Sequence, residues 1–526
     1  MIRNDPESIY RQYLAGVDYL TRNNFYDNCE QNYNFYIGKQ WEREYFGTEK
    51  TPSYNIIKNI VDYKVSSIAQ KGFSIVYSPS SLRGDREKKA ALCELLNINA
   101  SRAWEKLKMD KHIWDIILDG AVFGSSYAYF YTDETGMKMN IIDSANILFG
   151  DEQKNDIQSQ PYILILSREA VSSLREQARK NGYDEGNITN ITPDEETRVF
   201  VGENAKRELE NGDENEKCLS ILKLYKKDGE VHAVRVTKNA YIMPEVKIAG
   251  MKNYPVCRFA WKEDKGSARG LSEVFPLIDN QVEINKSLFR LLSGIRQFAF
   301  PHVVYDSAVL SRDGVEKLST VGSSIALNNM KMQKIDDVIG YMQPSAINPI
   351  AGNIIPQMIE LTTSLAGTSE ASLGTVNPEN ASGAAIIAVR DAAEIPLNRH
   401  VASLRQFVED MAEVWLEMMF VYGEDEIEVV VSDDGGMPEI KYIPREDLGR
   451  YVFDIRIDIS SSSPFSKYAR EEALSKLFLS GAITFEEYAE SLDDDSASPK
   501  GKLMDIIYKR SASAVGFEGE KVPVTE

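Results

Sequence analysis

The stretch SEVFPLIDNQVEINKSLFRLLSGIRQ, residues 272–297, decides how the chain is organised. Ser272 can cap a helix, and Pro276 lies in the first turn, where its missing N–H costs least. Apolar residues then recur at helical spacing as far as Ile295. A helix over 273–297 would be about 37 Å long at 1.5 Å per residue. We therefore expect a long strut helix near the middle of the chain.

The residues after this strut predict a small insert and a returning helix. Residues 298–347 are a short mixed segment with a strand-like start at 301–305, and residues 350–365 have a helical pattern again. Residues 367–383 are rich in Gly, Ser, Thr, Asn and Pro, and no packed element accounts for them. Two helices therefore bracket a small insert and lead into a long polar loop.

The C-terminal part begins with the longest helical pattern of the chain, residues 384–422. Pro396 interrupts it and should kink the helix, because proline removes a hydrogen-bond donor and clashes with the preceding turn. Strands are expected at 426–431 and 453–459, where they would complete the sheet formed earlier in the chain. Helices are expected at 467–480 and 484–491.

The N-terminal part predicts helices followed by a β-rich layer. Helical patterns cover 7–38, 55–70 and 86–119, and alternating residues at 127–131 and 137–141 predict a hairpin. A second hairpin joins 222–225 to 231–236 through Asp228 and Gly229, a pair suited to a type I′ turn. A helix is expected at 168–181, and the acidic stretch 184–217 is interpreted as a solvated insertion. The fold class is therefore α+β.

The composition excludes several classes of protein. The 526 residues include 60 Lys+Arg and 80 Asp+Glu, and the net charge of -20 is opposite in sign to that of most duplex-binding proteins. No CxxC pair occurs, so we expect the four cysteines to be reduced core residues: Cys29, Cys93, Cys218 and Cys257. The N-terminus has no apolar signal core and no apolar run is long enough for a membrane span, so a cytosol-like compartment is expected.

Motifs for catalysis are missing from the sequence. It contains no phosphate-binding loop ending in Lys-Ser or Lys-Thr, no GxGxxG, no HExxH and no GxSxG. The four histidines are isolated from one another, and the acidic runs 424–426 and 493–495 lack the spacing of a calcium loop. We expect no catalytic residue, no metal and no cofactor.

Three short sequence motifs support the same interpretation as the order of helices, insert and loop. They are NFYIGKQW at 34–41, NIIKNIVD at 55–62, and Leu373-Gly374 with NPENASG at 377–383. Together with the order of helices, insert and loop, they resemble the portal (connector) proteins of tailed double-stranded DNA bacteriophages, especially the siphophage-type family. The acidic insert 184–217 and the C-terminal helices depart from the family pattern.

The resemblance implies a mainly helical portal fold that assembles as a ring of about twelve copies. It divides the chain into a wing (1–271), a stem helix (272–297), a clip (298–347), a second stem helix (348–366), a tunnel loop (367–383), a long kinked helix with wing strands (384–460), and a crown with tail (461–526). The ring would occupy one capsid vertex of the virion, after assembly in the host cytoplasm. Double-stranded DNA would pass through it without sequence specificity, during packaging and ejection.

The resemblance also implies partners and site residues. The terminase large subunit and head-completion or adaptor proteins would dock on the clip, and major capsid and scaffolding proteins would surround the ring. The residues expected to contact DNA in the tunnel loop are Thr368, Ser369, Ser372, Thr375, Asn377 and Asn380. Further candidates for DNA-backbone or inter-subunit contacts are Lys286, Arg290, Arg296, Lys331 and Lys334, for which we favour ion pairs between subunits.

Three other classes of protein stay open at this point. Another head–tail connector ring is disfavoured because adaptors are usually much shorter. A packaging enzyme, either an ATPase or a nuclease, is disfavoured by the missing phosphate loop and by the lack of a recognisable carboxylate constellation. A non-viral scaffold would need some other reason for a long polar loop between two struts.

Overall fold

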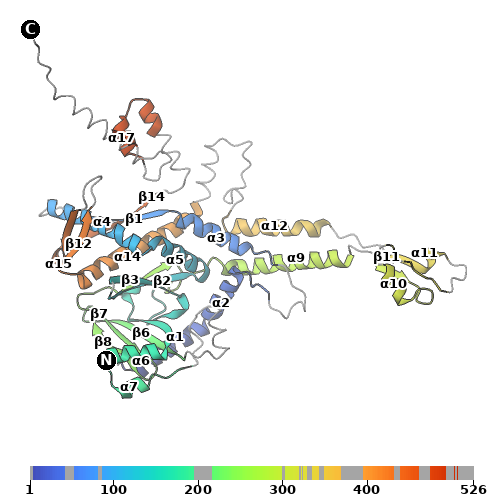
Figure 1. Cartoon of the computed structure of the whole chain (residues 1–526), viewed down its shortest axis with the longest axis horizontal. Coiled ribbons are helices and arrows are strands. Elements are labelled where there is room, and N and C mark those ends of the chain that lie inside the picture. Colours follow the sequence, from blue (N-terminus) through green and yellow to red (C-terminus); the bar gives the residue numbers. More distant parts are fainter. Residues whose placement is uncertain are drawn as a thin grey trace, which may run out of the picture. The chain divides into compact units, whose positions relative to one another are not determined.

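The computed structural model describes residues 4–41, 53–80, 86–134, 136–194, 216–298, 302–318, 322, 324–328, 334–342, 349–368, 395–431, 439–460, 474–492, 503 and 506–507. Within these ranges the chain is a mixture of helices and strands, which confirms the predicted α+β class (Figure 1). The chain divides into two compact units. The first unit comprises residues 1–30, 61–273 and 370–526, and the second comprises 31–60 and 274–369.

A five-stranded antiparallel sheet forms one layer of the first unit. Its order is β4 (Ile147–Phe149), β5 (Tyr162–Ala170), β6 (Lys217–Lys227), β7 (Glu230–Val236) and β8 (Tyr241–Lys247). The β6–β7 turn places Asp228 at φ 55° and Gly229 at φ 81°, which confirms the predicted type I′ hairpin.

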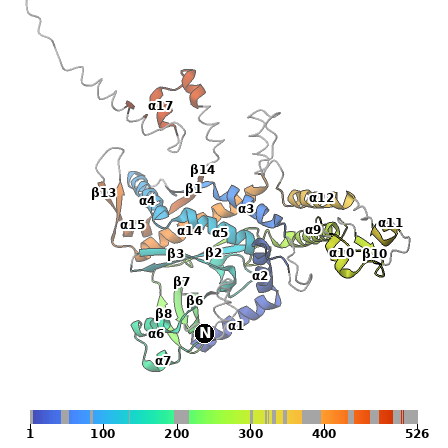
Figure 2. The same ribbon diagram turned by 45° about the vertical axis from the view of Figure 1, so that its right-hand side comes forward.

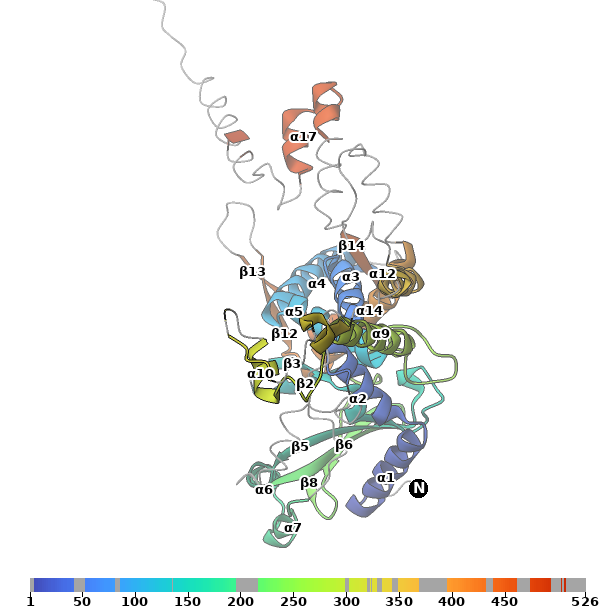
Figure 3. The same ribbon diagram turned by 90° about the vertical axis from the view of Figure 1, so that its right-hand side faces the viewer.

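Helices cover both faces of this sheet. Helix α1 (Pro6–Arg22) buries Ile9, Tyr13, Val17 and Leu20 against β4, β5, β6 and β7. Helices α6 (Val171–Lys180) and α7 (Glu185–Thr189) bury their apolar side chains with Cys218 and Ile242 on the other side (Figure 3). The alternation of side chains along β6 explains this division, since Leu219 faces α1 and Cys218 faces α6.

A three-stranded sheet continues the first unit. Its order is β3 (Gly136–Ile142), β2 (Ser125–Asp133) and β9 (Val256–Ala260), which confirms the predicted hairpin of β2 and β3. Helix α5 (Met109–Phe123) and helix α14 (Asn398–Tyr422) pack on it. Gly124 joins α5 to β2 at φ +93°, and an added Cβ there would lie 2.2 Å from the Gly270 carbonyl oxygen. Only glycine fits this close backbone approach.

The late strands do not complete the earlier sheet, so that prediction was wrong. Strand β14 (Phe453–Ser460) pairs with β1 (Gly72–Pro79), and β12 (Glu426–Val431) pairs with β13 (Glu439–Pro444). Helix α4 (Arg86–Lys106), α14 and α15 (Arg445–Arg450) share a core with both pairs. Short 3-10 turns lie at Ser144–Asn146, Ile157–Ser159, Phe275–Leu277 and Ile395–Leu397, and α17 spans Phe485–Glu490.

The second unit contains the strut helices. Helices α9 (Ile278–Phe298) and α12 (Pro349–Leu365) lie side by side, and the segment between them contains β10 (His302–Tyr305) paired with β11 (Ile339–Met342), together with α10 (Arg312–Leu318) and α11 (Ile335–Val338) (Figures 1 and 2). Helices α2 (Phe25–Tyr36) and α3 (Ile56–Ala69) run from one unit into the other. The predicted helix, insert and return helix are therefore present.

Two predicted helices needed correction. The pattern over 86–119 is two helices, because Lys108 takes the left-handed conformation (φ 53°) between α4 and α5. The helix expected at 168–181 begins at Val171, since Arg168 to Ala170 belong to β5 and pair with Lys217 to Leu219. Of the acidic insert 184–217, the structure describes α7 and the start of β6, and residues 195–215 lie outside the described ranges.

Candidate functional site

A buried polar network fixes the beginning of α9 within the second unit. The Gln281 side-chain oxygen accepts hydrogen bonds from the backbone N–H groups of Ile56 (2.9 Å) and Ile57 (3.4 Å). Its amide nitrogen donates to the Tyr54 carbonyl (2.7 Å) and to Asn285 (3.0 Å). Because Gln281 satisfies two N–H groups at the start of α3, it joins the two helices without using a charge.

Among the described side chains of α9, Glu283 and Arg290 are exposed and Lys286 is half-buried. Lys286 Nζ lies 2.9 Å from Glu283 Oε1, one helical turn away, and this hydrogen bond lowers the pKa of Glu283. Arg290 is exposed, and its charge also lowers the pKa of Glu283. Lys286 thus has a partner within its own chain, and its contact with DNA or with another subunit stays a prediction.

The other predicted cations are only partly described. Lys334 is exposed just before α11, and Arg296 belongs to α9, whose side chains are described as far as Ile295. Lys331 lies outside the described residues.

Thr368, predicted as a loop residue, ends helix α12. Gly367 takes φ +71°, and its N–H donates to the Ser364 carbonyl (3.0 Å). The N–H and the hydroxyl of Thr368 both donate to the Thr363 carbonyl, at 2.9 and 3.0 Å. This is a Schellman motif, and it leaves Thr368 buried with its hydroxyl bound to the helix. The other predicted tunnel-loop residues, Ser369, Ser372, Thr375, Asn377 and Asn380, lie outside the described residues.

Pro396 lies in a 3-10 turn that precedes α14. The turn spans Ile395–Leu397 and α14 begins at Asn398, so proline occupies a position before the regular helix. Residues 384–394, which the sequence placed on the other side of a kink, lie outside the described residues.

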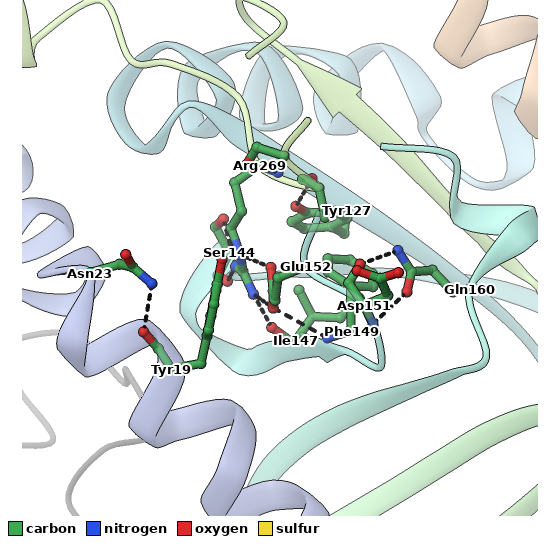
Figure 4. Close-up of polar contacts among 12 residues, drawn as sticks. Tyr19, Asn23, Tyr127, Ser144, Ile147, Phe149, Asp151, Glu152, Gln160 and Arg269 are labelled. Atoms are coloured by element: carbon green, nitrogen blue, oxygen red, sulfur yellow. Dashed lines mark hydrogen bonds and ion pairs between the residues drawn. The ribbon is translucent and has the colours of Figure 1, made fainter. Parts of the chain in front are cut away.

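A buried arginine ties the segment after β9 to the β4 end of the five-stranded sheet (Figure 4). Arg269 makes two bonds to Glu152, from Nε to Oε2 (3.0 Å) and from Nη2 to Oε1 (2.9 Å). It also donates to the carbonyls of Ile147 (2.7 Å) and Ser144, and its guanidinium lies 4.4 Å from the centroid of the Phe25 ring. Burial opposes the charge, but Glu152 and the hydrogen bonds raise the pKa of Arg269 overall.

Two further sets of buried polar contacts stabilise the first unit. Lys64 Nζ lies 2.6 Å from Glu273 Oε1, and Trp261 Nε1 donates to Glu273 Oε2 (3.0 Å). His400 Nδ1 lies 2.7 Å from the Trp261 carbonyl oxygen, with the two rings stacked at 4.2 Å. Burial lowers the pKa of His400. The pairs Arg269–Glu152, His400–Trp261 and Lys64–Glu273 have no local sequence signal, because their partners are 117, 139 and 209 positions apart.

An acidic groove of about 500 Å³ lies between β9 and α14 in the first unit. Burial, together with nearby carboxylates, raises the pKa values of Asp410 and Glu413 on its wall. Burial also raises the pKa of the Cys257 thiol, so it is a poor nucleophile. No histidine is among the described residues that line the groove.

The described ranges lack two other kinds of feature. There, no three His, Cys, Asp or Glu side chains come together in a way that could hold a metal ion. In the same ranges, no helix is both long and apolar enough to cross a membrane. All four cysteines are buried and free, as the sequence predicted.

The central and C-terminal parts of the chain match a known protein family. The family model described as "Phage P22-like portal protein" matches residues 176–492, more than half of the chain. The matched range contains α9, the insert, α12 and the predicted loop motif at 373–383, whereas the strings at 34–62 precede it. No curated protein matches. The chain belongs to the P22-like portal protein family of bacteriophages.

Proposed function

We propose that about twelve copies of this chain form a ring at a unique capsid vertex, through which double-stranded DNA enters and leaves the capsid. As a phage portal protein the chain is a structural protein of the virion, concerned with DNA packaging and head–tail connection. The observation that carries the proposal is the family match, which includes both strut helices and the segment between them.

The charge of the chain supports a channel in which DNA slides. Twelve copies would carry 12 × (-20) = -240 formal charges. Duplex DNA has one negative charge per about 1.7 Å of axis, so tight Lys or Arg contacts would resist its movement. A wall of the same sign lowers that friction.

The proposed division of labour follows the elements. Helices α9 and α12 form the stem, and residues 298–347 between them form the clip, where the terminase large subunit and later the head-completion or adaptor proteins dock. Residues 1–271 and 384–460 form the wing, which meets major capsid and scaffolding proteins, and residues 461–526 form the crown. Assembly takes place in the host cytoplasm.

The segment 367–383 is proposed as the tunnel loop. Its small polar side chains suit contact with phosphate and sugar without reading bases. Because Thr368 closes α12, the loop proper would start at Ser369, and Thr368 would fix its first residue to the stem.

Shortening this loop separates assembly from transport. Deletion of residues 370–379 should leave rings intact and yield capsids without DNA, measured by electron microscopy of particles and by the packaged genome per particle. Replacement of the same residues by a Gly/Ser segment of equal length is the matched control for length. Wild-type packaging by the shortened chain would refute the tunnel-loop assignment, and so would failure of its rings to form.

A further inference from the structure

The exposed half of α12 carries two stripes of opposite character. Ile354, Leu361 and Leu365 are 46%, 64% and 77% exposed, and their spacing of seven and four residues places them on one side of the helix, with Met358 partly buried between them. Beside them runs a polar stripe with the same spacing, formed by Asn353, Gln357, Glu360 and Ser364. A polar stripe suits water, but apolar side chains at this spacing are typical of a helix–helix seam.

Helix α9 offers a face with matching spacing. Glu283, Ser287, Arg290 and Gly294 repeat at four and three residues along its outer side. Gly294 lies inside the helix, where glycine costs stability relative to alanine, and an added Cβ there would meet nothing within 4 Å. Nothing in the described part of the chain requires this glycine, and a side chain from another copy could approach the helix there closely.

The two faces match in height along the helices. Helix α9 ends at Phe298 and α12 begins at Pro349, on either side of the same insert. Counted from those ends, Gly294 and Ile354 lie four and five residues away, and Ser287 and Leu361 lie eleven and twelve residues away. At about 1.5 Å per residue, each pair differs in height by only about 1.5 Å when the two ends are level.

The charges on the two faces are complementary. Glu360 is the only charged residue of α12, and it lies next to Leu361 at a position that flanks the apolar stripe. Counted from the same ends, Glu360 is eleven residues away, about 16 Å, and Arg290 is eight residues away, about 12 Å. A long arginine side chain can span this difference, and flanking positions are where helix pairs form ion pairs.

We propose that the apolar stripe of α12 packs on the Glu283–Gly294 face of α9 in a second copy of the chain, with Glu360 of one copy paired to Arg290 of the next. This inference rests on the proposed ring. Rotation about a ring axis preserves height and joins two different patches, so a stripe on one helix meets a face of the other. A stripe that packed on itself would instead close a two-fold dimer.

Charge reversal tests the pairing in the full-length chain. Glu360→Arg and Arg290→Glu should each lower the fraction of chain in rings, by more than about tenfold, because each places like charges together at the contact. The double variant E360R/R290E should restore the rings, as measured by mass photometry. Glu94→Arg makes the same change of charge at an exposed position of α4 and is the matched control.

Cysteine cross-linking tests the register. The four native cysteines are buried, so Ile354→Cys combined with Gly294→Cys should give a covalent ladder of multiples of one chain under mild oxidation. Each single variant should give no ladder. Cross-linked dimers from I354C alone would overturn the proposal in favour of a two-fold contact.

The outcomes separate this contact from the proposed function. The proposed contact would be overturned if both charge variants formed rings as well as the wild type and the double-cysteine variant gave no cross-linked ladder. The portal function would then still stand. A wild-type chain that stays single at all concentrations would count against the ring and the contact together.

Discussion

Removal of the Arg269 side chain should destabilise the first unit strongly. Arg269 and Glu152 are nearly buried, with side-chain exposures of 8% and 7%, and they share two hydrogen bonds of 2.9 and 3.0 Å. In Arg269→Met, an apolar side chain leaves two backbone carbonyls without their donor and leaves the Glu152 carboxylate with only the Phe149 N–H at 3.3 Å. Breaking a buried pair in this way costs about 3–5 kcal/mol.

The double variant shows how much of that cost is the orphaned charge. In R269M/E152L both charges are gone, and buried ion pairs replaced by apolar residues are often close to neutral. The double variant should therefore be more stable than R269M alone, with a coupling free energy of about 1–3 kcal/mol. Additive effects of the two single substitutions would contradict this account of the pair.

The loss of stability can be measured by hydrogen exchange of individual peptides. This measurement suits a chain with two compact units, because such a chain need not unfold in a single two-state transition. The 3–5 kcal/mol loss corresponds to exchange faster by about 10²–10⁴-fold at the amides of β4 and β5 when they exchange by unfolding. Peptides from α9 and α12 are the internal control. Less than about fivefold faster exchange at β4 and β5 would refute the reasoning.

Three further predictions concern stability. Burial, together with neighbouring carboxylates, raises the pKa of Asp119 from 3.8 to about 7. Between these pH values the folded chain keeps a proton that the unfolded chain releases. The free energy of unfolding therefore falls as the pH rises through this window. Asp119→Asn should thus stabilise by up to about 4 kcal/mol at pH 8 and by little at pH 4, and equal shifts in Tm at both pH values would contradict this. Gly124→Ala forces a Cβ to 2.2 Å from the Gly270 carbonyl oxygen, so Tm should fall by several degrees, and an unchanged Tm would disprove the close approach. Glu273→Leu leaves Lys64 buried without its partner at 2.6 Å and should cost about 3–5 kcal/mol in urea unfolding, whereas a loss below about 1 kcal/mol would mean that the pair is dispensable.

Features with a local cause were predictable from sequence. The strut and return helices were expected at 273–297 and 350–365, and α9 and α12 span Ile278–Phe298 and Pro349–Leu365. Both patterns depend on helical periodicity and on proline near the start. The Asp228–Gly229 turn was predictable for the same reason, since few residues tolerate positive φ.

Features that depend on distant partners were not predictable. Strand β1 pairs with β14 across most of the chain, and no local pattern in either strand names the other. The break at Lys108 has no glycine or proline to announce it, because a lysine takes the left-handed conformation there. Tertiary packing decides both features.

The site divides in the same way. The pairing of Lys286 with Glu283 has a sequence signal, the i,i+3 spacing of opposite charges on a helix. The role of Thr368 also had one, since Gly367 is a typical C′ residue and places Thr368 in the helix end. The bond between Arg269 and Glu152 had none, because it joins residues 117 positions apart.

The central claim is that this portal-family chain closes into a ring with a channel. The most direct test is mass photometry with negative-stain imaging of the purified full-length chain near neutral pH, without DNA or nucleotide. The account predicts a particle near 12 × 59.2 kDa, about 710 kDa, with a central hole. Particles of one chain, 59.2 kDa, or closed dimers at every concentration would contradict it.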